Sequence, residues 1–98
     1  MILVTGSFVA KQGQLADALA PSIEHVHRSR TEPGCISHAV HQDAENPRRL
    51  VFVEEWVDRA ALAAHFALPE SRAFARAVCA LAVAVPTINV YDATRVAP

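Results

Sequence analysis

The segment Leu50–Trp56, with the sequence LVFVEEW, most strongly limits the folds open to this chain, because it reads as a strand that is apolar on both faces. Successive side chains of a strand point to opposite sides. One face therefore carries Leu50, Phe52, Glu54 and Trp56, and the other carries Val51, Val53 and Glu55. Helices can cover one such face in a small protein, and a second copy of the sheet is the economical cover for the other. We therefore expect a homodimer.

The length and composition indicate one domain, residues 1–98. The hydrophobic share of 52% is slightly above the usual value and agrees with a buried subunit interface. The net charge is −1 and no basic stripe is present, which argues against a nucleic-acid partner. The longest apolar run, Ala77 to Pro86, is too short to cross a membrane, and the first residues do not resemble a signal peptide. We expect a cytoplasmic protein without a membrane partner.

The pattern of the whole chain predicts four strands, over residues 2–10, 36–42, 50–56 and 87–92. Apolar residues at three- and four-residue steps predict a helix from Gln14 whose buried face carries Leu15, Leu19, Ile23 and Val26. Pro21 lies inside this helix, and we expect it to kink or break the helix because proline lacks the N–H donor.

A second helical region follows the third strand. Asp58 is a plausible N-cap for a helix that ends near Leu68, and Pro69 separates it from a further helix over about residues 70–83. The resulting order, β-α-β-β-α-β, is that of the α+β ferredoxin-like motif with an antiparallel sheet.

Several of these segments together resemble a known family. They are the turn Glu32-Pro33-Gly34-Cys35, the two strands that follow it, and the helix with Asp58, Ala61, Leu62, His65 and Phe66. This arrangement resembles the antibiotic biosynthesis monooxygenase domain, a family of small dimeric α+β proteins that includes quinol monooxygenases. The resemblance extends from Val4 to Tyr91. It implies a dimeric α/β-barrel arrangement of two ferredoxin-like sheets.

The resemblance also implies a reaction, since some relatives oxidise activated phenols or quinols with molecular oxygen alone. An electron-rich phenolate can itself reduce dioxygen, so the protein has to bind it, deprotonate it and exclude water. No P-loop, dinucleotide fingerprint or nucleophile elbow is present. We therefore expect a monooxygenase without a cofactor, acting on a small aromatic, quinol-like or polyketide-like substrate.

His65 and Glu54 are the candidate catalytic residues. His65 matches a histidine of the family's helix, and imidazole titrates near neutrality, so it can accept a phenolic proton. Glu54 lies between Phe52 and Trp56 on one strand face, where a carboxylate is costly to bury unless it is paired. It could orient His65 or bind a substrate hydroxyl.

Three further residues are candidates for substrate binding. Trp56 and Phe66 offer flat surfaces for an aromatic ring, although packing in the core is the more common role of such residues. His25, in the last turns of the first helix, can reach the pocket lining.

A metal site is not expected from the histidine spacing. His25 and His27, two residues apart on a helix, cannot face one ligand, and His38 and His41 lie on opposite faces of their strand. No cluster of cysteine and histidine has the spacing of a zinc site.

Two alternative functions stay open at the level of sequence. The same pocket could isomerise a small oxygenated metabolite, with His65 and Glu54 as acid and base. It could also bind a ligand without any chemistry, as part of a dimeric binding module.

Overall fold

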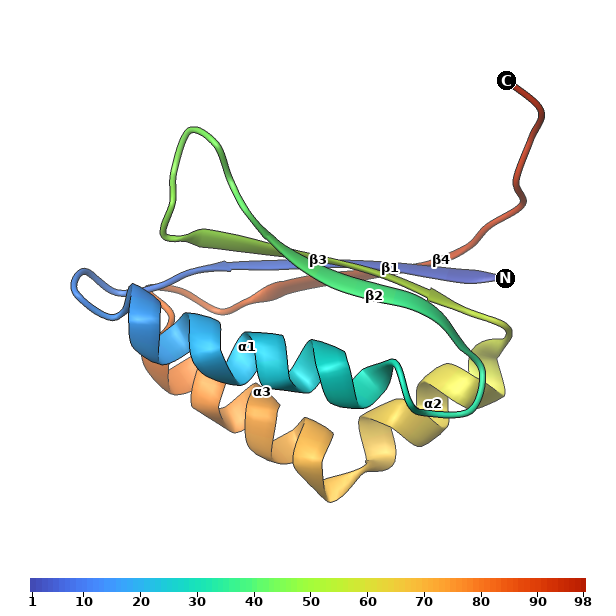
Figure 1. The fold of residues 1–98 in the computed structure, drawn as a ribbon, viewed down its shortest axis with the longest axis horizontal. Helices are drawn as coiled ribbons and strands as arrows, with labels where there is room; N and C mark the ends of the chain where they lie inside the picture. Colours follow the sequence, from blue (N-terminus) through green and yellow to red (C-terminus); the bar gives the residue numbers. More distant parts are fainter.

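The computed structural model describes all residues from Met1 to Pro98 and consists of one sheet with three helices on one side of it (Figure 1). The predicted ferredoxin-like order is confirmed, with the second helical region divided into two helices at Pro69. The elements in chain order are β1 (Ile2–Val9), α1 (Leu15–Ser29), β2 (Cys35–Gln42), β3 (Arg49–Trp56), α2 (Arg59–Ala67), α3 (Pro69–Leu81) and β4 (Thr87–Asp92).

The sheet is antiparallel throughout, in the order β2-β3-β1-β4. Its register places Glu54 of β3 between Val4 of β1 and His38 of β2. In Figure 1, α1 and α3 run beneath the sheet and α2 lies at one end, whereas the upper face has no helix over it. Every side chain that the inner face of the sheet presents therefore points toward the helical layer.

The two faces of β3 are divided as the alternation predicts. Leu50, Phe52, Glu54 and Trp56 are all buried beneath the helices. On the opposite face Val53 is 36% exposed, and Tyr91 on β4 is 50% exposed. The outer face of the sheet thus keeps apolar residues that nothing in this chain covers.

Helix α1 differs from the prediction in two respects. It continues through Pro21 from Leu15 to Ser29, so the expectation that proline would break it was wrong. The carbonyl that loses its donor is that of Asp17, which is on the exposed side and open to water. Ile23, predicted to be buried, is 40% exposed. The side of the helix that is buried instead consists largely of small and polar residues: Ala18, Ser22, His25, Val26 and Ser29.

Local signals fix the boundaries of α2 and α3. The Asp58 carboxylate accepts a hydrogen bond from the N–H of Ala61 at 2.8 Å, as expected of an N-cap. Leu68 is extended, with ψ of 138°, because the proline that follows it disfavours the helical conformation, and Pro69 then begins α3. None of the three helices is long and apolar enough to cross a bilayer.

The apolar core consists of two separate clusters. The larger one lies between α1, α3 and the sheet and includes Phe8, Leu50 and Phe52. The smaller one lies beneath α2 and contains Ile2, Val4, Trp56 and Leu62. Glu54 stands on β3 between Phe52 of one cluster and Trp56 of the other, so polar side chains separate the two halves of the core.

Gly34, at the start of β2, gives a test of this packing. Its φ is +82°, and a Cβ atom there would lie 2.5 Å from the Cβ of Ala61. We expect Gly34→Ala to lower the free energy of unfolding by roughly 3 kcal/mol, because a left-handed residue and a steric overlap are both introduced. Gly13→Ala is the matched control, since Gly13 has a φ of +79° but no atom within 4 Å. It should cost only about 1 kcal/mol. Equal losses for both variants in urea unfolding would contradict this account.

Candidate active site

A pocket of about 290 Å³ lies between the inner face of the sheet and the three helices. One end is polar and contains His25, His38, Glu54 and His65. The remaining wall is mostly apolar and aromatic, with Phe8, Phe52, Phe66, Phe74, Val78 and Ile88. Gly6, on the inner face of β1, adds no side chain to the floor and so leaves room beside Phe52. A flat apolar molecule with one polar edge suits such a space.

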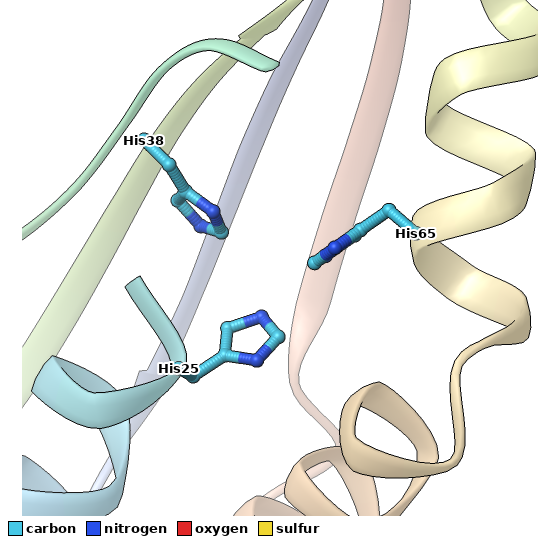
Figure 2. Close-up of side chains that lie close together, drawn as sticks. All are labelled: His25, His38 and His65. Carbon is cyan, nitrogen blue, oxygen red and sulfur yellow. The ribbon is translucent and has the colours of Figure 1, made fainter. Parts of the chain in front are cut away.

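Three histidines from three different elements meet at the polar end. His25 comes from α1, His38 from β2 and His65 from α2, and Figure 2 shows their rings directed into one shared space. The ring centroids are 5.1 Å apart for His25 and His65, 5.4 Å for His25 and His38, and 5.8 Å for His38 and His65. Each residue is at most 5% exposed.

Hydrogen bonding fixes the tautomer of His65. Its Nδ1 lies 2.7 Å from Oε1 of Glu32, a residue of the turn between α1 and β2. A carboxylate only accepts hydrogen bonds, so Nδ1 carries the proton and donates it. The other nitrogen, Nε2, then has a free lone pair. A carboxylate that orients an imidazole in this way is the arrangement found behind catalytic histidines that act as bases.

His25 has the opposite tautomer. Nη2 of Arg28, one turn further along α1, lies 2.6 Å from its Nδ1. Guanidinium groups only donate, so Nδ1 must accept and the ring proton is on Nε2. The His25 ring is stacked on Phe74, with centroids 4.1 Å apart and an angle of 9° between the rings. His25 is therefore held as a hydrogen-bond donor beside the aromatic wall.

Glu54 and Trp56 form a buried hydrogen bond behind the histidines. Nε1 of Trp56 donates to Oε1 of Glu54 at 2.9 Å, and Oε2 of Glu54 lies 3.5 Å from Nε2 of His38. Neither ring nitrogen of His38 has a hydrogen-bond partner, although the residue is only 2% exposed. Buried polar groups without partners are rare and costly. His38 is thus the least satisfied side chain of the site.

Burial controls the charge of these groups. Removal from water lowers the pKa of His25 to about 3, with smaller added effects of His38, His65 and Arg28. Burial also lowers the pKa of His38 to about 3, with added effects of His65 and Arg30. Burial raises the pKa of Glu54, although the Trp56 hydrogen bond acts in the opposite direction. At neutral pH, His25 and His38 are therefore uncharged imidazoles.

The predicted site residues separate into two groups. His65, Glu54, His25 and Phe66 all line the pocket. Trp56 does not, because it is completely buried beneath α2, so its predicted contact with the substrate was wrong. The suggestion that Glu54 orients His65 is also replaced, since the carboxylate bonded to His65 is Glu32.

Sequence reasoning missed three residues of the site: Glu32, His38 and Ser71. In the sequence, Glu32 is simply part of a predicted turn. Its place in the site is apparent only from its hydrogen bond to His65, 33 positions away. His38 was compared only with His41 of the same strand, which lies on the opposite face, and not with histidines of other elements. Ser71 lines the pocket from the first turn of α3 and has a buried hydroxyl without a partner. Glu54, on the inner face of β3, was the available sequence signal of a polar interior.

The sequence profile of the antibiotic biosynthesis monooxygenase family matches residues 1–77. A curated relative, the uncharacterised protein sll1783 of Synechocystis, is 37% identical over 68 residues, which are 69% of this chain and 46% of that protein. The matching region is thus less than half of that relative's length. These matches establish the family to which the chain belongs.

Solved structures agree with this assignment. A crystal structure of an antibiotic biosynthesis monooxygenase superposes with a TM-score of 0.89 at 29% identity, covering 97% of this chain and 100% of that one. A candidate antibiotic biosynthesis monooxygenase from Deinococcus radiodurans superposes with a TM-score of 0.94 at 24% identity, covering 100% and 97%. The second comparison bears on the fold alone. The chain is a member of the antibiotic biosynthesis monooxygenase family.

The buried histidines predict a dependence of stability on pH. Unfolded histidines have a pKa near 6.5, whereas His25 and His38 have values of about 3 in the folded protein. Between about pH 6.5 and 3 the unfolded chain binds more protons, so the free energy of unfolding falls as the pH falls. Each histidine contributes about 1.4 kcal/mol per pH unit at most. Glu54, whose pKa is raised, binds its proton earlier in the folded state and offsets part of this effect.

We therefore expect a loss on the order of 2 kcal/mol between pH 7.5 and 5, measured by urea unfolding. His38→Gln should flatten the dependence on pH, whereas His41→Gln, on an exposed residue, should leave it unchanged. A free energy of unfolding that is constant over this range would refute the burial of neutral histidines.

Proposed function

We propose that the protein is a cofactor-independent monooxygenase that oxidises a small aromatic, quinol-like or polyketide-like phenol with molecular oxygen. The observation that carries the proposal is the hydrogen bond of His65 to Glu32, which leaves Nε2 of His65 as a base at the polar end of an aromatic pocket. Membership of the family supports the reaction class.

The residues divide the chemistry between them. Nε2 of His65 takes the phenolic proton, and the negative charge of Glu32 stabilises the imidazolium that forms. Nε2–H of His25 faces the same space and donates to the phenolate oxygen. Phe52, Phe66 and Phe74 hold the ring and exclude water. The site thus holds a base and a hydrogen-bond donor for one developing charge.

The oxidation then balances without a further reductant. The phenolate gives one electron to dioxygen, and the resulting superoxide and phenoxyl radical join through a carbon–oxygen bond. The peroxide takes the proton from His65. Loss of water from the peroxidised CH carbon leaves a carbonyl group, so one oxygen atom enters the product and the other leaves as water.

Oxygen consumption by chelator-treated protein with hydroquinones and anthrone-type phenols tests the base. We expect His65→Gln to reduce turnover by about 10²–10⁴-fold, the usual contribution of general base catalysis. His27→Gln is the matched control, since His27 is exposed on α1 and outside the pocket. Full activity of the His65→Gln variant would remove His65 from the mechanism. Product formation without oxygen uptake would favour isomerisation by the same base.

Glu32→Gln tests the orienting role. Glutamine can still accept the hydrogen bond from Nδ1 but lacks the charge, so we expect a smaller loss of turnover and a lower apparent pKa in the pH–rate profile. A loss of turnover with an unchanged profile would indicate a purely structural contact.

The outer face of the sheet supports the proposal of a homodimer in the α/β-barrel arrangement. Val51, Val53 and Tyr91 lie on this face, and nothing in the chain covers them. We expect light scattering to give about twice the chain mass of 10.6 kDa, and Val53→Glu to shift the mass to that of one chain. Ala16→Glu, on the exposed side of α1, is the control. A single-chain mass for the unaltered protein would contradict the dimer.

A further inference from the structure

We propose that His25, His38 and His65 form a binding site for a divalent first-row transition-metal ion such as Zn²⁺. One nitrogen from each ring lies within 4.8 Å of the other two, and all three residues are buried. Zinc accepts three histidine ligands with a fourth position left open, and imidazole also suits copper, iron and nickel. The open position would face the pocket, whose other walls are largely aromatic. This site is not needed for the proposed function.

His65 already has the form of a metal ligand. Nδ1 donates to Glu32, so the lone pair that could bind a metal is on Nε2. A ligand histidine in proteins typically donates its second N–H to a carboxylate, which fixes the ring and makes the coordinating nitrogen more basic. Glu32 also brings negative charge near the ion, and its Oε2 is buried without a partner.

The environment of His38 is a second argument for the metal site. Both of its nitrogens are buried and neither forms a hydrogen bond. Coordination would give one of them a strong partner, since the nearest acceptor of the protein, Oε2 of Glu54, lies 3.5 Å from Nε2 without a hydrogen bond. His25 and His38 are both buried, which favours the neutral imidazole that binds metals. No proton has to be displaced from His38 for it to coordinate.

Arg28 sets the limit on affinity. Its Nη2 donates to Nδ1 of His25 and keeps the ring proton on Nε2. For His25 to coordinate through Nε2, this proton has to move to Nδ1, and Arg28 has to release the ring. Its charge also repels a cation. Glutamine in place of Arg28 could accept the Nδ1 proton, so Arg28→Gln should favour the tautomer that binds the metal.

An ion in this position would affect the proposed chemistry. It would occupy the lone pair on Nε2 of His65 that proton abstraction requires. Metal binding is therefore expected to inhibit, and the metal-free protein is the active form.

Calorimetric titration of chelator-treated protein with Zn²⁺, and visible absorption with Co²⁺, tests the site. We expect one ion per chain, binding at least tenfold weaker in His38→Gln and His65→Gln, and at least tenfold tighter in Arg28→Gln. His27→Gln and His41→Gln, on exposed residues, should bind as the unaltered protein does. X-ray absorption of the zinc-loaded unaltered protein should show three imidazole ligands, which keeps the test decisive if a variant does not fold. No binding, or fewer than three imidazoles, overturns the proposal.

Oxygen uptake measured in the same samples separates this inference from the proposed function. Binding with loss of uptake supports both. Binding with uptake that requires the metal supports the site and overturns metal-free oxidation. Uptake without any metal binding overturns the site alone. Binding that leaves uptake unchanged overturns the placement of the ion on His65.

Discussion

The cost of burying ionisable groups in a very small core is the constraint on which the rest of the structure depends. Four ionisable side chains lie between the two apolar clusters: His25, His38, Glu54 and His65. A larger protein could place additional hydrophobic residues at this position. Three of the four side chains have a hydrogen-bond partner that offsets this cost. These partners are Arg28 for His25, Trp56 for Glu54 and Glu32 for His65. A core divided in this way gives up some stability in return for a space that is both dry and polar.

The hydrogen bond between Glu32 and His65 has a structural role as well as a chemical one. It joins the turn after α1 to the helix α2, two segments 33 positions apart. Gly34 allows the same turn to approach Ala61 closely. His65 and Glu32 are thus positioned by one close contact of the backbone, and the candidate site depends on that contact as much as on its own side chains.

Much of the fold could be predicted from the sequence because its signals are local. The alternation in Leu50–Trp56 gave the correct faces of β3, and Asp58 and Pro69 gave the limits of the helices. The site was less accessible. Spacing shows which residues of one element are neighbours, so it excluded pairs such as His38 and His41 but contained no information on three rings from α1, β2 and α2. Likewise, the apolar residues of α1 predicted its buried side only in part. Val26 is buried and Leu19 packs against the apolar core, whereas Ile23 is exposed. The ring of His25 lines the pocket.

Trp56 is the only tryptophan of the chain, and it lies completely buried with its ring centroid 4.7 Å from that of His65. Its indole N–H donates a hydrogen bond to Glu54, so Trp56 contacts the Glu54 carboxylate and lies beside the His65 imidazole. Indole emission responds to the polarity around the ring and is quenched by a nearby protonated imidazole. The chain therefore contains its own optical reporter, placed where a change in the charge of His65 alters the fluorescence of a single residue.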